Sequence, residues 1–420
     1  MAASDLGHPG TSERLGALVD RVWPQAGVAS SPVAVTVGAP PERHVVAETY
    51  AVVPDLARAR YLVPLGSRRA AVATLWAYHT MRAPKRRAAE AAVSTMFRTG
   101  LGDRVFRDRL VVSIDELVPR SSYPDWLVVA HLARELDCAQ LFAGLAVRRV
   151  QPNAKPMLEL YDGEGLAQGF AKLGWSVATK ALVSTEVDAL TDLRGRLDRL
   201  VVPEPLCNGT FGDHRFSVVT PLARGLRRYH DDPVVASEVP LAVAESTEMV
   251  KTPLAGSAYA RRLHDVLSSV AGDAPDAWRV TRDWLLRLER SPEPILFGRW
   301  HGDWVPHNLG EARQQVAAWD WEHSSTHTPV GFDALHWHYQ RSLARSGLAG
   351  AVEDAEKTAA KLGGFGVSTS ARGLTASLYL LEMFLRAAVQ AVGGGGWNPR
   401  VYPAMLDVAA RRDLELPELT

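Results

Sequence analysis

Apolar and polar residues alternate along the first part of the chain in short runs separated by turn residues. Runs rich in Val, Ile and Tyr predict strands, whereas apolar residues three and four positions apart predict amphipathic helices. These patterns predict that residues 1–121 form a small α+β domain. Its strands are expected at 33–37, 45–53, 61–65 and 109–114, and its helices at 15–22, 69–81 and 87–97.

The next part of the chain, residues 122–222, is predicted to be an antiparallel sheet joined by hairpins. The segment from Asp162 to Gly165 is typical of a hairpin turn, because Asp and Gly adopt the backbone conformations that tight turns need. The predicted strands are 141–147, 156–161, 166–175, 201–205 and 216–219, and the predicted helices are 124–138 and 179–200.

The remainder of the chain, residues 223–420, has mostly helical spacing, so we expect a helical domain there. The apolar run from Val316 to Trp319 is an exception and predicts a short buried strand that ends at Asp320. Helices are expected at 256–270, 276–289, 352–362, 371–392 and 402–412 and directly after Gly331, with a glycine loop at 393–396.

Three side chains in this last part have the chemistry that phosphoryl transfer requires. Asp303 follows His301 and Gly302, and Asn308 comes five residues later. Asp320 stands at the end of the predicted strand and is followed by Trp and Glu. Phosphoryl transfer needs a carboxylate that orients and deprotonates the attacking hydroxyl, and hard oxygen ligands that hold Mg²⁺ against the phosphates.

The order H-G-D-x4-N followed by D-W-E resembles the H-R-D-x4-N and D-F-G segments of protein kinases. With Gly in the second position and D-W-E in place of D-F-G, it is most similar to the aminoglycoside phosphotransferase and choline kinase branch of that superfamily. The resemblance implies Asp303 as catalytic base, Asn308 and Asp320 as Mg²⁺ ligands, and ATP or GTP as co-substrate. It also implies an α+β, bilobal, protein-kinase-like fold, with a small antiparallel-sheet N-lobe (122–222) and a helical C-lobe (223–420), here preceded by the α+β domain 1–121.

A lysine and a glutamate in the predicted N-lobe are expected to form an ion pair. Lys172 lies in the middle of an apolar strand, and Glu186 lies on the apolar stripe of the next helix. An unpaired buried carboxylate is costly, and Lys172 is the nearest strong candidate for its partner. The kinase resemblance implies that Lys172 contacts the α- and β-phosphates and that Glu186 orients it. It also implies a hinge at residues 220–222, and a structural role for Asp333 in steadying the loop around Asp303. A helix N-cap is an equally good interpretation of Asp333 from sequence.

The segment 148–155 departs from the kinase pattern. A kinase has a glycine-rich flap here, because glycines let backbone amides approach the phosphates closely. This segment contains no glycine, and Arg148, Arg149 and Lys155 are its charged candidates for phosphate binding.

The bulk composition excludes some classes of function. Lys and Arg number 47, as do Asp and Glu, so the formal net charge is zero, which argues against a nucleic-acid binder that relies on overall positive charge. The two cysteines, Cys138 and Cys207, lack metal-site spacing and are expected to be free thiols in a reducing cytoplasm. The sequence shows neither a signal-peptide pattern nor an apolar run long enough to cross a membrane.

Together these features predict a cytoplasmic phosphotransferase that moves the γ-phosphoryl group of ATP or GTP to a hydroxyl of a small molecule. The acceptor could be an aminoglycoside, another antibiotic, a sugar or an amino alcohol. Residues 1–121 could cap the cleft, select the acceptor or form a homodimer, and the sequence does not separate these roles.

Two alternative functions remain open from sequence. One is a nucleotide-binding protein of the same fold without catalysis. The other is a metal-dependent hydrolase that uses Asp303 and Asp320 with nearby histidines, namely His301, His307, His323 and His327. The aromatic side chains of this region could either stack on a sugar or pack in the core, and they are Trp300, Trp304, Trp337 and Tyr339.

Overall fold

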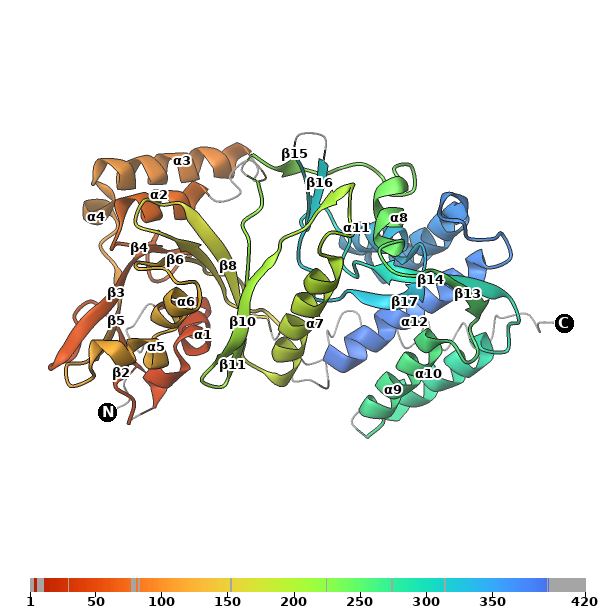
Figure 1. Ribbon diagram of the computed structural model, residues 1–420, viewed down its shortest axis with the longest axis horizontal. Coiled ribbons are helices and arrows are strands. Elements are labelled where there is room, and N and C mark those ends of the chain that lie inside the picture. Colours follow the sequence, from red (N-terminus) through yellow and green to blue (C-terminus); the bar gives the residue numbers. More distant parts are fainter. Residues whose placement is uncertain are drawn as a thin grey trace. The chain divides into compact units, whose positions relative to one another are not determined.

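The computed structural model divides into two compact units, and Figure 1 labels their elements. The first unit comprises Met1–Val187 and Pro203–Arg227, and the second comprises Asp188–Val202 and Arg228–Thr420. The structure describes residues 4–5, 11–28, 30–76, 81, 84–151, 153–223, 225–272, 275–312, 315–390 and 392. The helix predicted at 402–412 and the loop predicted at 393–396 lie outside the described residues.

The first unit is built on one ten-stranded sheet in the order β1-β2-β5-β3-β4-β6-β7-β8-β11-β10. Every pairing in it is antiparallel except that of β1 with β2. The strands are β1 (Ser4–Asp5), β2 (Val33–Val37), β3 (His44–Val53), β4 (Tyr61–Pro64), β5 (Arg109–Asp115), β6 (Phe142–Ala146), β7 (Met157–Tyr161), β8 (Ala167–Gly174), β10 (Pro205–Phe211) and β11 (His214–Val219).

This sheet continues without a break across residue 121. Strand β4 pairs with β6, and Tyr61 lies opposite Ala146 in that register. Residues 1–121 and 122–222 therefore share one sheet, and a domain boundary at 121 stays a prediction. Among the described residues, the first unit also contains α1 (Glu13–Val22), α2 (Arg68–Trp76), α3 (Pro84–Thr99), α4 (Gly102–Val105), α5 (Tyr123–Trp126), α6 (Val128–Glu135) and the start of α7 (Val177–Leu193).

Two predicted helices are shorter than expected. The predicted helix 124–138 is divided into α5 and α6, because Leu127 between them has extended backbone (φ −114°, ψ 119°) and buries its side chain. Helix α7 ends at Leu193 instead of residue 200. Gly195, two residues after Leu193, has φ +71°, the left-handed conformation that commonly follows the end of a helix.

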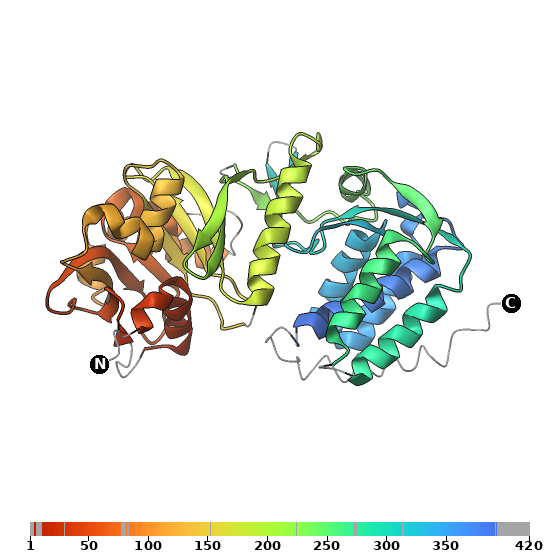
Figure 2. The same ribbon diagram turned by 60° about the horizontal axis from the view of Figure 1, so that its bottom comes forward.

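The second unit combines a helical bundle with two small sheets. Figure 2 shows its helices, teal to blue, gathered together. The described helices are α8 (Glu238–Ala244), α9 (Ala258–Val270), α10 (Pro275–Leu288), α11 (Phe332–Ala359) and α12 (Arg372–Gln390). One sheet has the order β12-β15-β16-β9 and the other β13-β14-β17. Their strands are β9 (Leu200–Val201), β12 (Arg227–Arg228), β13 (Val250–Pro253), β14 (Pro294–Trp300), β15 (Leu309–Ala312), β16 (Gln315–Ala318) and β17 (Ser325–Pro329).

The predicted α+β class is confirmed. The helix predicted at 352–362 belongs to the long helix α11, which is kinked at Gly347 (φ 73°). Across the described residues no helix is both long and apolar enough to span a bilayer. Both cysteines, Cys138 and Cys207, are free and half-buried.

Candidate active site

The second unit brings the three predicted phosphoryl-transfer residues to one end of a β-hairpin. Strands β15 and β16 pair with Leu309 opposite Ala318. Asn308 directly precedes the first strand, and Asp320 follows the second by two residues. The Trp319 amide donates to the Asn308 carbonyl at 3.1 Å and so closes this end of the hairpin. Asp320 itself adopts φ +72°, a conformation that Asp and Asn tolerate better than most residues.

Both carboxylate oxygens of Asp303 accept hydrogen bonds from fixed donors. The Asn308 side chain donates from Nδ2 to Asp303 Oδ2 at 2.7 Å, and also to the Asp303 carbonyl at 3.1 Å. His336 Nε2 lies 3.1 Å from the other oxygen, Oδ1. Burial alone would raise the pKa of Asp303, but the hydrogen bond and the charge of His336 hold it well below its usual range. Asp303 is therefore a carboxylate at neutral pH, with its orientation fixed on both sides.

His336, which sequence reasoning missed, lies behind Asp303 on helix α11. The ring is fully buried, and its Nδ1 lies 3.0 Å from the hydroxyl of Tyr379, which is also fully buried. Burial lowers the pKa of His336, while the neighbouring Asp303 opposes that shift. Asp303, His336 and Tyr379 thus form one continuous hydrogen-bonded chain that reaches from the loop into the helical core.

His301 anchors the start of the loop as a neutral ring. Its Nδ1 accepts from the Asp303 backbone N–H at 3.2 Å, and its Nε2 donates to the Trp319 carbonyl at 3.1 Å. Burial lowers the pKa of His301 to about 4, so the ring is uncharged near neutral pH. Because both nitrogens are occupied, His301 is a poor metal ligand. Among the residues that the structure describes, no three His, Cys, Asp or Glu side chains group in a way that could hold a metal ion.

Asp333 fixes the backbone of the loop. Its two oxygens accept the backbone N–H groups of His301 at 2.8 Å and Gly302 at 3.1 Å. Burial raises the pKa of Asp333 to about 7, against the lowering effect of these two hydrogen bonds. The predicted structural contact of Asp333 with the loop is therefore present. Arg386 adds a further hydrogen bond at 2.7 Å, from Nη1 to the Gly302 carbonyl.

Gly302 is required by the shape of this loop. Its φ is +87°, and a Cβ added there would overlap the carbonyl oxygen of His323. The glycine in the H-G-D motif thus allows the loop to pass directly against the segment that follows Asp320. The aromatic residues weighed as sugar-stacking candidates are all buried and belong to the core, namely Trp300, Trp304, Trp337 and Tyr339.

The first unit contains the predicted ion pair between strand β8 and helix α7. Lys172 Nζ lies 2.7 Å from Glu186 Oε1, and the two side chains are 12% and 3% exposed. Lys172 is paired in the sheet with Met157 on β7 and with Ser217 on β11, so its backbone is held in the middle of the sheet. The predicted pairing is confirmed, and the sheet and helix fix the position of the ammonium group.

The segment 148–155 is held by contacts of its backbone with other parts of the first unit. The Ala154 carbonyl accepts from Arg21 Nη1 at 3.3 Å and from Trp175 Nε1 at 3.1 Å. The Arg21 guanidinium also stacks over the Trp175 ring, 4.3 Å from the centroid. Helix α1 therefore supports this segment through Arg21.

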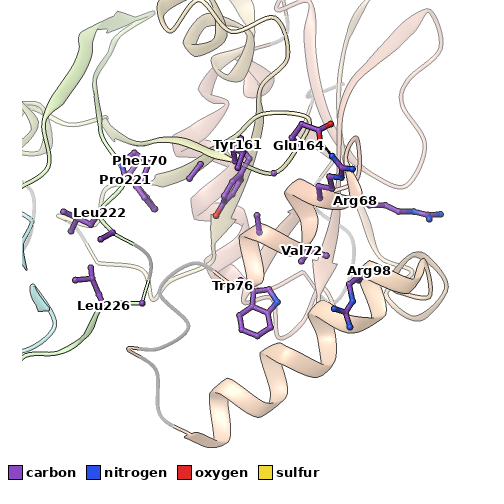
Figure 3. Close-up of a pocket in the computed structure, with 17 residues that line it drawn as sticks. Arg68, Val72, Trp76, Arg98, Tyr161, Glu164, Phe170, Pro221, Leu222 and Leu226 are labelled. Atoms are coloured by element: carbon purple, nitrogen blue, oxygen red, sulfur yellow. Dashed lines mark ion pairs between the residues drawn. The ribbon is translucent and has the colours of Figure 1, made fainter. Parts of the chain in front are cut away.

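A cavity of about 930 Å³ lies within the first unit. Figure 3 shows its walls, with Val72 and Trp76 on one side, Tyr161 and Phe170 on the sheet, and Pro221, Leu222 and Leu226 on the segment after β11. The predicted hinge, 220–222, thus contributes two residues to this cavity. Sequence patterns could not predict it, because its walls come from three distant parts of the chain.

No protein-family model and no curated protein matches the chain. Among solved structures, a protein described as a fructosamine-3-kinase from Haemophilus somnus 129PT is 10% identical (TM-score 0.42), and the match covers 69% of this chain and 97% of that one. The streptomycin–ATP–APH(2″)-IIa complex is 9% identical (TM-score 0.41), with 69% and 95% covered. Choline kinase LicA from Streptococcus pneumoniae is 11% identical (TM-score 0.39), with 68% and 96% covered. These are small-molecule kinases, the group that the motif around Asp303 resembles, and the likeness is remote.

Proposed function

We propose that the protein is a Mg²⁺-dependent phosphotransferase that moves the γ-phosphoryl group of ATP or GTP to a hydroxyl of a small molecule. The observation that carries the proposal is the arrangement around Asp303. Three groups lie at one end of a single hairpin. They are the Asp303 carboxylate with both oxygens hydrogen-bonded, the Asn308 carboxamide 2.7 Å from it, and the Asp320 carboxylate. This is the donor set that positioning and electrostatic stabilisation of phosphoryl transfer require.

Asp303 would act as the base in this reaction. The acceptor hydroxyl loses its proton to the Asp303 carboxylate as its oxygen bonds to the γ-phosphorus. The bond from that phosphorus to the oxygen bridging the β-phosphate breaks, and the nucleoside diphosphate leaves. The low pKa of Asp303 keeps it deprotonated at neutral pH, ready to accept this proton.

Asn308 and Asp320 would hold the metal ion. Because Asn308 Nδ2 donates to Asp303, the carbonyl oxygen Oδ1 is the atom that this side chain can offer to a cation. Carboxylate and amide oxygens are ligands that Mg²⁺ accepts. The ion, when bound, would neutralise negative charge on the phosphates and orient them for attack.

Lys172 would contact the phosphates from the first unit. Its ion pair with Glu186 holds the ammonium group at a defined point of the sheet. Segment 148–155 contains no glycine, so we assign the main phosphate contact of this unit to Lys172.

Calorimetric titration with ATP and GTP, with and without Mg²⁺, tests the proposed nucleotide and metal site. Wild-type protein should bind at least one nucleotide saturably in a Mg²⁺-dependent way. Asp320→Asn should weaken that binding strongly, because it removes a ligand charge while its amide tolerates φ +72°. Asp231→Asn, at an exposed carboxylate of the same unit, is the control and should bind normally. Absence of binding by either nucleotide would contradict the proposal.

A further inference from the structure

The cavity of the first unit lies on the face of the sheet that carries Lys172. Phe170 lines the cavity, and it lies two residues before Lys172 on β8, so both side chains project from the same face. The two residues are about 6.6 Å apart along the strand. In a nucleotide, one sugar separates the base from the phosphates. A nucleotide with its phosphates at Lys172 could therefore place its base against Phe170.

A bulge extends this face toward the hairpin turn. The register between β7 and β8 shifts between Leu160 and Tyr161, and Tyr161 lies opposite Ala167. The extra residue, Gln168, lets both Ala167 and Phe170 face the cavity although they are three positions apart. The sheet thus presents one aromatic and apolar surface that begins beside Lys172 and ends at the turn.

Helix α2 supplies the wall that the sheet lacks. Val72, Ala73 and Trp76 lie on one side of this helix and line the cavity (Figure 3). Trp76 is 48% exposed, although a tryptophan is usually largely buried. A large aromatic side chain that stays exposed on the wall of a concave, mostly apolar site is suited to stacking on a planar ligand.

The charged residues of the cavity lie at its rim. Arg69 pairs with Glu164. Arg68 and Arg98 are exposed, and the Arg68 guanidinium lies beside Gly100. The interior is therefore apolar and aromatic, which fits an uncharged ring better than an anion, while Lys172 provides the positive charge further along the same face.

We infer that helix α2 of the N-terminal segment is part of the nucleotide site, where Trp76 supplies an aromatic wall for the base. The inference rests on the proposed function and adds to it a role for the N-terminal segment. Trp76 stacks on the purine ring, and Lys172 holds the phosphates. The other walls are provided by Phe170, Pro221, Leu222 and Leu226.

Titration of the full-length protein with two probes tests the inference, one probe being MgATP or MgGTP and the other inorganic tripolyphosphate, which has no base. Trp76→Ala should raise the Kd for the nucleotide roughly tenfold, because the variant loses the aromatic surface on which the base stacks. It should leave the tripolyphosphate Kd unchanged, and Trp76→Phe should restore most of the nucleotide affinity. Lys172→Ala should weaken binding of both probes.

Leu117→Ala is the matched control, because Leu117 is an exposed apolar residue (74%) of the same unit that does not line the cavity. Far-UV circular dichroism establishes that each variant is folded. If wild-type protein binds nucleotide and Trp76→Ala binds it equally well, the inference is wrong and the proposed function stands. Equal weakening of both probes by Trp76→Ala also overturns the inference. If wild-type protein binds no nucleotide, the proposed function itself fails.

Discussion

Replacing His336 by leucine removes the ring that joins Asp303 to Tyr379. In the wild-type protein the two Asp303 oxygens have one side-chain partner each, at 2.7 Å from Asn308 and at 3.1 Å from His336. Leucine has a similar size but no donor, so Oδ1 loses its hydrogen bond. The buried hydroxyl of Tyr379 loses its ring partner at the same time.

The expected loss of activity follows from these contacts. A hydrogen bond to a charged group contributes about 1.5–3 kcal/mol, and misplacement of a reacting group by about 1 Å can lower a rate a hundredfold. We expect kcat to fall by roughly tenfold to a hundredfold, with a smaller change in KM for the nucleotide. His336 lowers the pKa of Asp303, so the pKa of Asp303 should be higher in the variant. On acidification the variant should therefore become inactive at a higher pH than the wild-type enzyme.

Steady-state kinetics from acidic to mildly alkaline pH, in the presence of Mg²⁺, provide the assay. His336→Gln, which keeps a donor near the position of Nε2, should recover part of the activity and of the pH profile. His338→Leu is the control, since that histidine lies on the same helix but contacts Asp232 at 3.0 Å. If His336→Leu has the kcat and the acidic limb of the wild-type enzyme, the role assigned to His336 is wrong.

Two further predictions concern stability. Gly302→Ala should destabilise the protein by about 3 kcal/mol, because the added Cβ overlaps the His323 carbonyl and the residue has a positive φ. Gly373→Ala is the control and should not destabilise the protein, since a Cβ there meets open space. Urea unfolding measures the stability of both variants. Asp333 has a pKa raised from 3.8 to about 7, so its contribution to stability is fully present below about pH 4 and is lost as the pH rises through about 7. The melting temperature of the wild-type protein should therefore decrease as the pH rises through this range, and it should decrease less in Asp333→Asn. An identical pH dependence in the two proteins would contradict this assignment.

The sequence contained enough information to predict elements whose signal is local. Residues 33–37 form β2 as their β-branched pattern predicts, and Ser12 caps helix α1 just before its apolar stripe begins. The pairing of Lys172 with Glu186 was also predictable, because a carboxylate on an apolar helix face requires a nearby cation.

Features that depend on distant contacts could not be predicted in this way. His336 has the spacing of an ordinary core residue of α11, and its role arises only because Asp303, 33 positions earlier, packs against it. The pairing of β4 with β6 joins residues more than eighty positions apart, so the single sheet of the first unit was not apparent from local patterns. Strand β14 was missed because Pro294 at its first residue resembles a loop signal, although proline is tolerated at that position of a strand.

Transfer of labelled γ-phosphate from ATP and from GTP to a panel of hydroxyl acceptors tests the central claim most directly. The panel should include aminoglycosides, sugars, amino sugars and amino alcohols, with Mg²⁺ present. We predict transfer to at least one acceptor by the wild-type protein, and its loss in Asp303→Asn with nucleotide binding retained. Equal transfer by Asp303→Asn would contradict the assignment of Asp303 as base. Nucleotide binding without transfer to any acceptor would instead indicate a binding protein without phosphotransferase activity.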